Sequence, residues 1–205
     1  RDRMVFTKEQ CERAVERSLR TNPIVKFVYE AIEACGCEVN RNFINCRECD
    51  IDIAGGFRCP DGVVVCQNKC QSQEEIDAVL AHELIHAYDF CRAKDLDWRR
   101  LVCRPAKPGA VEYNVAAACG WPLMRRCKQH ACSEVRAANL SGDCHFSKEL
   151  GRGNFEIRKG HEKCVRRRAE LSVSMNPNCK GVHKEVVDMV FAECKADTAP
   201  FDRVP

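Results

Sequence analysis

Residues 79–91, with the sequence VLAHELIHAYDFC, contain the pattern that decides the fold and the chemistry of this chain. His82, Glu83 and His86 stand in the order His-Glu-x-x-His, and Asp89 follows three residues later. At about 3.6 residues per turn, His82 and His86 lie roughly one turn apart on the same face of a helix. Because two imidazoles at that spacing can bind one cation, the stretch predicts a metal site on a helix.

The neighbouring residues predict a long amphipathic helix over 73–92. Ser72 and Glu75 form a capping-box pattern at its start. Apolar residues recur at helical spacing along one side: Ile76, Val79, Leu80, Leu84 and Ala87. The alternative is an ordinary amphipathic helix that carries two histidines, but a chance match to the motif is on the order of one in a hundred. We therefore interpret the helix as metal-binding.

The composition is that of an ordinary globular protein. The chain of 205 residues is long enough for one sizeable domain, or at most two small ones. Its hydrophobic fraction is 45%, its charged fraction is 31%, and its net charge of +3 is too small to indicate a nucleic-acid partner. No apolar run approaches the ~18 residues that span a bilayer. We expect a protein that is soluble, or at most peripherally attached to a membrane.

Seventeen cysteines are the unusual feature of the composition. In a reducing cytosol such a number would indicate metal clusters, whereas in an oxidising compartment it indicates disulfides. The odd count leaves at least one thiol outside any disulfide within the chain. Cys46-x-x-Cys49 followed by Cys66-x-x-x-Cys70 also approximates the spacing of a structural zinc site. A cysteine-rich zinc-binding module is therefore an alternative to the metal helix.

The rest of the chain predicts an α+β fold in one domain over residues 1–205. Short β-branched segments separated by turn residues occupy 37–70 and predict a small, mostly antiparallel sheet before the metal helix. Further helices are expected over 7–19, 22–36, 131–140, 160–175 and 181–195. Residues 102–129 hold three prolines and two glycines without a sustained period, so we interpret them as a loop or an insertion.

The order of residues in the motif matches the chemistry of catalytic zinc. In such sites Zn²⁺ takes three protein ligands, often including imidazole nitrogens, and keeps one position for water. Glu83 is rotated by about 100° from His82 around the helix axis, so it cannot coordinate in the same direction but can reach that water. This is the position that a general base requires. The motif therefore predicts His82 and His86 as metal ligands and Glu83 as the catalytic residue.

A catalytic zinc site needs a third ligand, and Glu134 is the best candidate. It lies on the helix predicted after the insertion, beside small residues that permit close packing. Asp89 follows His86 on the same straight helix, where a short side chain orients a ligand more readily than it completes the coordination. His130, Asp143 and His145 are also candidates for the third ligand.

Several blocks of the sequence resemble one known family. HELIHAYDFCRA from His82, ACSEVRAANLSGDC from Ala131, and AGGF and VVCQN before the metal helix are similar to the mitochondrial inner membrane proteases that process ATP synthase subunit 6. The similarity runs from Cys11 to the C-terminal PFDRVP and leaves out 102–129. The paired blocks around His82 and Glu134 are specific to this family, whereas the zinc motif alone is not.

The resemblance implies a zincin-like metalloprotease, with the small sheet packed on the His-Glu-x-x-His helix and additional helices at both ends of the chain. It maps the catalytic glutamate onto Glu83 and the metal-binding histidines onto His82 and His86. The implied activity is removal of the N-terminal presequence of the ATP synthase subunit 6 precursor, with a separate role in assembling the membrane sector. The implied location is the intermembrane space, peripherally associated with the mitochondrial inner membrane.

The resemblance also accounts for most of the cysteines, because family members acquire disulfides during import. The recurring positions appear here as Cys11, Cys37, Cys46, Cys49, Cys66, Cys91, Cys132, Cys144, Cys164 and Cys194. Seven others lie outside that set: Cys35, Cys59, Cys70, Cys103, Cys119, Cys127 and Cys179.

Two further functions are compatible with the sequence. One is an assembly chaperone whose peptidase activity is dispensable. The other is a secreted cysteine-rich metalloprotease, in which the sequon at Asn139 would be glycosylated.

Three local features each allow more than one interpretation. The strand GVVVC before the metal helix is either an edge that pairs with an extended substrate or a buried strand. The basic run CVRRRAE at 164–170 is either a lipid-binding surface or a solvated helix face. Tyr88, His130 and His145 are candidates for stabilising the oxyanion, and none is assigned.

Overall fold

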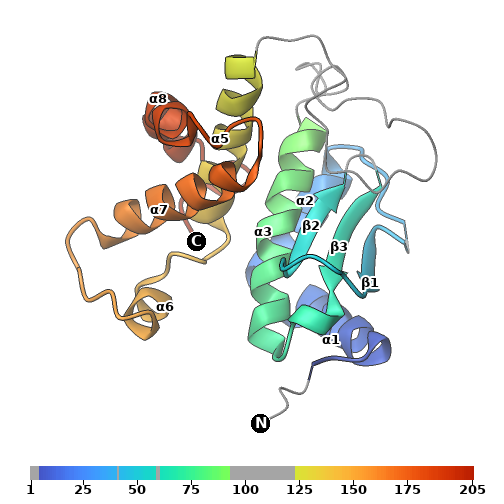
Figure 1. Cartoon of the computed structure of the whole chain (residues 1–205). Helices are drawn as coiled ribbons and strands as arrows, with labels where there is room; N and C mark the ends of the chain where they lie inside the picture. The colour runs from blue at the N-terminus through green and yellow to red at the C-terminus, as the bar shows by residue number, and fades with distance from the viewer. Residues whose placement is uncertain (1–4, 41, 59–60, 93–122) are drawn as a thin grey trace. The chain divides into compact units, whose positions relative to one another are not determined.

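The computed structural model describes residues 5–40, 42–58, 61–92 and 123–205, which form an α+β protein (Figure 1). Their contacts divide them into two compact units. Unit 1 contains residues 5–92, 140–143 and 199–205, and unit 2 contains 123–139 and 144–198. The α+β class is confirmed, whereas the zincin-like arrangement and the single domain over 1–205 stay predictions.

Unit 1 begins with two helices whose ends are determined by the predicted caps. Helix α1 (Lys8–Thr21) starts with a complete capping box, in which Thr7 Oγ1 accepts from the Gln10 backbone and Gln10 Oε1 accepts from the Thr7 backbone. Helix α2 (Pro23–Ala34) is capped by Asn22, whose side chain accepts from two backbone N–H groups. Both helices are confirmed.

Among the described residues, the sheet of unit 1 has three strands, β1 (Ile44–Arg47), β2 (Gly55–Arg58) and β3 (Gly62–Cys66), in the order β1-β3-β2. Strand β3 pairs antiparallel with β2 and parallel with β1. The prediction of a mostly antiparallel sheet was therefore wrong, because β1 and β3, which another strand separates along the chain, run in the same direction. The short 3₁₀ helix η1 (Gln67–Lys69) follows β3.

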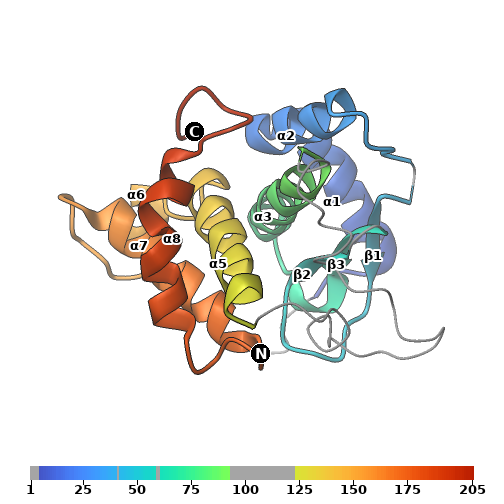
Figure 2. The same ribbon diagram turned by 90° about the horizontal axis from the view of Figure 1, so that it is seen from above.

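Helix α3 (Gln73–Arg92) has the bounds that the sequence predicted, and it lies beside α2 and the sheet (Figures 1 and 2). It packs against α1, α2, β2 and β3. Its fully buried side chains include Ile76, Leu80, Leu84 and Ile85. Removing four such side chains from water stabilises the unit by roughly 1.5–3 kcal/mol each before entropy is counted. The motif is thus built on a helix that packs against four other elements of the unit.

Unit 2 contains α5 (Leu123–Leu140), α6 (Phe146–Gly151), α7 (Gly160–Met175) and α8 (His183–Ala196). Apolar residues of α5, α7 and α8 form its core (Figure 2). Helix α5 begins before the predicted 131–140, so the last residues of the proposed insertion are helical; Leu, Met, Arg, Lys and Gln at 123–129 all favour a helix. The part of that insertion over 102–122 lies outside the described residues.

Six disulfides join cysteines of the described residues, three in each unit. Those of unit 1 are Cys11–Cys46, Cys37–Cys91 and Cys49–Cys66. Those of unit 2 are Cys127–Cys179, Cys132–Cys194 and Cys144–Cys164. All ten cysteines that the family resemblance singled out are paired with one another, and the remaining pair is Cys127–Cys179. Within the described parts of the chain, no helix is both long and apolar enough to cross a bilayer.

Candidate metal and catalytic site

His82, Glu83 and His86 are the partly exposed side chains of an otherwise buried stretch of α3. Leu84 and Ile85, which lie between them, are completely buried. The helix therefore anchors the motif through its apolar side and leaves the two imidazoles and the carboxylate accessible. Such an arrangement restrains the functional side chains while it allows a ligand to reach them.

The two histidines are close enough to act on one cation. Their ring centroids lie 4.8 Å apart, and the ring planes are inclined by 79°. This proximity follows from the four-residue spacing within one helix and needs no other element. The helix geometry expected from the motif is confirmed for His82 and His86, and the neighbouring imidazoles fit a shared divalent metal.

Strand β2 approaches α3 next to Glu83, and a glycine makes this approach possible. A Cβ atom added at Gly55 would lie 2.5 Å from Cγ1 of Val79 and 2.7 Å from the carbonyl oxygen of Val64. The same position is 3.8 Å from Cγ of Glu83. Any side chain at Gly55 would push β2 away from the helix, so this glycine sets the distance between the strand and the candidate general base.

The strand proposed to pair with a substrate is not an edge strand. Residues Gly62–Cys66 form β3, which is hydrogen-bonded on both sides and largely buried. The interpretation of this segment as a buried strand is therefore correct. Strand β2, at the end of the described sheet and beside Glu83, is the edge next to the motif.

The C-terminal turn of α3 is held by several interactions. Asp89 is buried and accepts a hydrogen bond from Nε of Arg92 at 3.1 Å. The Arg92 guanidinium also lies over the ring of Tyr88, 5.6 Å from its centroid. The Cys37–Cys91 disulfide fixes the helix end to the segment after α2. The predicted roles of Asp89 in orienting His86 and of Tyr88 as an oxyanion donor stay predictions.

Glu134 lies on α5 in unit 2, where its carboxylate is buried and held by a histidine one turn earlier. Nε2 of His130 lies 3.2 Å from Oε1 of Glu134. Because Nδ2 of Asn176 can only donate to Nδ1 of His130, at 3.4 Å, a neutral His130 carries its proton on Nε2 and donates to Glu134. The four-residue spacing between His130 and Glu134 was the sequence signal for this contact.

Two further candidates for the third ligand have different surroundings. Asp143 is buried in unit 1, and its backbone N–H donates to Oγ of Ser141. His145 is exposed at the start of α6 in unit 2. His130 forms a hydrogen bond with Glu134. A residue in this position supports a metal ligand.

His82, His86 and Glu134 supply two imidazole nitrogens and one carboxylate oxygen, which are donor atoms that bind divalent metals. The donor types match those of catalytic zinc sites with two histidines and one glutamate. The histidines belong to unit 1 and the glutamate to unit 2. The residues therefore fit a divalent metal by their chemistry.

A motif of the His-Glu-x-x-His type on a buried helix, with the functional side chains accessible, is typical of peptidases. The model of the peptidase M76 family matches residues 9–105 and 119–202, which is most of the chain. The protein belongs to this family. The internal gap that the family model leaves unmatched, 106–118, lies within the stretch 102–129 that we interpreted as an insertion.

Known relatives agree with this assignment. The chain is 38% identical to the human mitochondrial inner membrane protease ATP23 homolog over 98% of its own length and 72% of that protein. It is 36% identical to ATP23 of Yarrowia lipolytica over 95% of the chain and 68% of the relative. It is 32% identical to the Schizosaccharomyces pombe protein, over 96% and 94% respectively. No solved structure matches the chain.

Proposed function

We propose that this protein is a zinc metalloendopeptidase that removes the N-terminal presequence of ATP synthase subunit 6 and assists assembly of the ATP synthase membrane sector. The observation that carries the peptidase activity is the accessible pair of imidazoles beside Glu83 on α3, in a chain of the peptidase M76 family. The names of the relatives support a role at the mitochondrial inner membrane.

His82, His86 and Glu134 would hold the zinc, and Glu83 would move the protons. Bound zinc would acidify a water molecule and polarise the scissile carbonyl. Glu83 accepts a proton from the attacking water and delivers it to the leaving amine. His130 donates a hydrogen bond to Glu134 and thereby keeps that carboxylate oriented.

Strand β2 is the element best placed to receive an extended substrate. It is the edge of the described sheet on the side of Glu83, and its backbone approaches α3 at Gly55. An extended peptide that pairs with β2 would run past the carboxylate of Glu83. Main-chain pairing would supply affinity without strong dependence on the substrate side chains.

The disulfides support the intermembrane space as the location. Six disulfides among the described residues indicate an oxidising compartment. They also rule against the structural zinc module, because Cys46, Cys49 and Cys66 are all engaged in disulfides. The fourth cysteine of that pattern, Cys70, is buried, and its burial raises the pKa of the thiol to about 11.

The folded structure disfavours a secreted glycoprotein. Asn139 of the sequon is buried, and its Nδ2 atom donates to the carbonyl oxygen of Lys195 at 3.1 Å. Its Oδ1 atom lies 2.9 Å from Nε2 of His161. Because Asn139 is only 1% exposed, a glycan attached at Nδ2 would displace the side chains packed around it, so the fold disfavours glycosylation at this position.

The variant Glu83→Gln tests the proposed activity. We expect it to reduce cleavage of the subunit 6 precursor by at least about a thousandfold while zinc content stays at the wild-type level, because an amide in place of the carboxylate cannot accept the proton. The measurement is the rate of precursor processing by purified protein, with Glu33→Gln as a matched exposed control. Processing at the wild-type rate by Glu83→Gln would contradict the proposal. Rescue of ATP synthase assembly by the same variant would separate the assembly role from the peptidase activity.

A further inference from the structure

Unit 2 exposes a concentrated group of apolar side chains over residues 146–159, which comprise α6 and the connection to α7 (Figure 1). We refer to this segment as the α6–α7 tip. Phe155 is 72% exposed and Ile157 is 85% exposed, and Phe146 and Leu150 are also exposed. Four large apolar side chains within one short segment exceed the scattered exposure expected of an ordinary surface.

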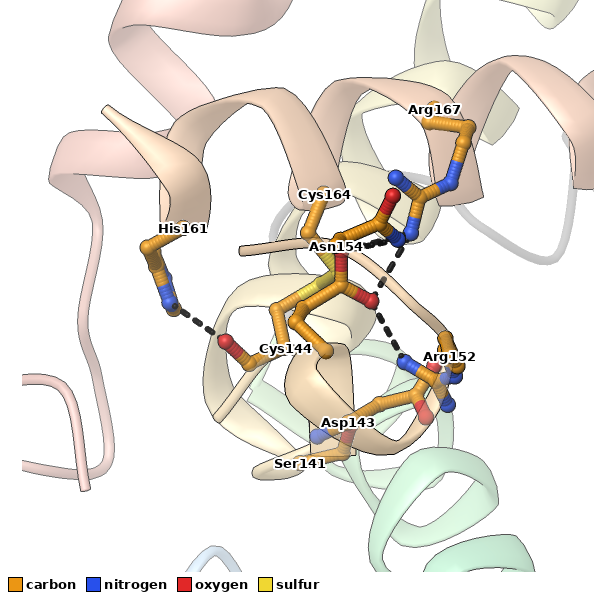
Figure 3. A network of polar contacts seen from close by, with 9 residues as sticks. Ser141, Asp143, Cys144, Arg152, Asn154, His161, Cys164 and Arg167 are labelled. Carbon is orange, nitrogen blue, oxygen red and sulfur yellow. Dashed lines mark hydrogen bonds and ion pairs between the residues drawn. A yellow bond between two sulfur atoms is a disulfide. The ribbon is translucent and has the colours of Figure 1, made fainter. Parts of the chain in front are cut away.

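The tip is held in place by a buried carboxylate. Arg167 Nη2 lies 2.8 Å from both oxygens of Glu149, and Arg152 donates to Oε1 at 2.9 Å. Asn154 donates to the same side chain at 3.0 Å, and its backbone N–H donates to the Glu149 carbonyl oxygen. Figure 3 shows Arg152, Asn154 and Arg167 with the dashed contacts of this network. The connection therefore presents Phe155 and Ile157 from a fixed support.

The charges that remain on the tip are positive. Glu149 is neutralised by two arginines, and Glu156 is paired with Lys163 at 2.5 Å. Lys148, Arg158 and Lys159 form no ion pair with any residue that the structure describes. The tip thus combines exposed apolar side chains with three basic ones, and both of its glutamates are compensated.

The basic run at 164–170 does not provide such a surface. Arg166 pairs with Asp188 and lies 4.1 Å over the ring of Phe191. Arg167 is engaged with Glu149. These arginines stabilise unit 2, which favours the interpretation of this run as a helix face over that of a lipid-binding patch.

We infer that the α6–α7 tip docks on the surface of an anionic lipid bilayer. Phe155 and Ile157 would enter the interface between headgroups and acyl chains, and Lys148, Arg158 and Lys159 would contact lipid phosphates. Long basic side chains can bury their stems beside the apolar ones and keep their charges at the headgroups. The tip combines exposed apolar side chains with basic ones, and this chemistry matches that surface.

A second copy of the chain is a poorer occupant of the same face. An isologous contact would bring the basic residues of two tips together, and their repulsion would oppose association. The inference builds on the proposed peripheral location at the inner membrane. It is independent of the peptidase chemistry, because no residue of the tip belongs to the candidate metal and catalytic site.

Vesicle flotation of the full-length protein tests the docking surface. The vesicles consist of phosphatidylcholine alone or of phosphatidylcholine mixed with phosphatidylglycerol. We expect the wild type to bind the anionic vesicles, and binding to weaken roughly tenfold or more in Phe155→Ser/Ile157→Ser and in Arg158→Gln/Lys159→Gln. The matched control is Met175→Ser/Met189→Ser, which removes two exposed apolar side chains elsewhere on unit 2 and should bind like the wild type.

A second measurement does not depend on loss of binding. In Phe155→Trp, the emission of the introduced indole should shift to shorter wavelength when anionic vesicles are added, because the ring moves into a less polar environment. Three results would each overturn the inference. The first is unchanged emission, and the second is equal binding of the wild type and both tip variants. The third is a wild-type protein that dimerises through the tip and does not bind vesicles. Cleavage of a soluble peptide should be unaffected in the tip variants, which separates failure of docking from failure of the proposed function.

Discussion

Gly55 lies on β2 close to Glu83 of α3, and its neighbours Val79 and Val64 leave no room for a side chain at this position. A Cβ at Gly55 would come within 2.5 Å of Val79 and 2.7 Å of the Val64 carbonyl oxygen. The Val64 oxygen belongs to the neighbouring strand and cannot rotate away. The position of β2 beside the candidate general base therefore depends on one missing methyl group.

Replacement of Gly55 by alanine should affect stability and activity together. We expect Gly55→Ala to lower the free energy of unfolding by about 1–3 kcal/mol, because the backbone must shift to relieve the contact. The shift moves β2 relative to Glu83, so precursor cleavage should fall as well. Urea unfolding and processing rates measure both effects. Gly181→Ala is the control, since an added Cβ there meets no atom within 4 Å; equal behaviour of the two variants would contradict this account.

Among the elements, the helices were predictable where their signals are local. Thr7, Asn22 and Ser72 each determine a helix start through residues two or three positions away. The parallel pairing of β1 with β3 depends on contacts between residues far apart in sequence, and the sequence contains no equivalent signal for it. Helix α6 was missed because its six residues are too few to show a period.

In the candidate site, too, the features with local sequence signals were predictable and those that depend on distant contacts were not. His82, Glu83 and His86 were predictable because helix geometry alone places them. The hydrogen bond from His130 to Glu134 also has a local signal, in the spacing of the two residues on α5. The approach of β2 to Glu83 could not be predicted, because it depends on packing between a strand and a helix. The glycines of AGGF gave only a general indication of close backbone contact.

The support of the α6–α7 tip should depend on pH through Glu149. Burial is the largest single influence and raises the pKa of this carboxyl, but hydrogen bonds and charges from Arg167 and Arg152 together lower the pKa below 4.5. A folded-state pKa below the ordinary value means that the carboxylate stabilises the fold at pH values above 4.5. That contribution is lost as the pH falls through the folded-state pKa.

Glu149→Gln isolates this contribution. At neutral pH we expect the variant to unfold with a free energy about 1–2 kcal/mol below that of the wild type, a modest value because both arginines are partly exposed. The difference should shrink as the pH is lowered below 4.5. Urea unfolding at a series of pH values measures it. Glu156→Gln, which changes an exposed ion pair with Lys163, should have little effect; a constant difference for Glu149→Gln would contradict the assignment.

At the scale of the whole molecule, disulfides take over part of the stabilisation that a larger core would supply. Five of the six described disulfides join the ten cysteines that the family resemblance identified. Cys127–Cys179 is the additional one, and it connects α5 to the segment between α7 and α8. The identity of the recurring cysteines could be predicted from the resemblance, whereas their pairing became evident only from the structure.

The number of residues between the paired cysteines should determine how much each of two disulfides in unit 1 contributes to the free energy of unfolding. Cys37–Cys91 spans 54 residues and Cys49–Cys66 spans 17. If constraint of the unfolded chain dominates, removing the first by Cys37→Ala/Cys91→Ala should cost about 1 kcal/mol more than removing the second by Cys49→Ala/Cys66→Ala. Chemical unfolding of the two double variants measures the difference. A larger loss for the shorter loop would show that native packing, and not chain entropy, determines the effect.

The metal content of the purified protein tests the central claim most directly. Elemental analysis of the wild type should find about one zinc per chain, and both His86→Ala and Glu134→Ala should lose it, because each removes one of three protein ligands. Zinc lost from His86→Ala alone would assign the third ligand to another residue. Zinc retained in both variants would place the metal away from the His-Glu-x-x-His helix and would contradict the proposed metallopeptidase.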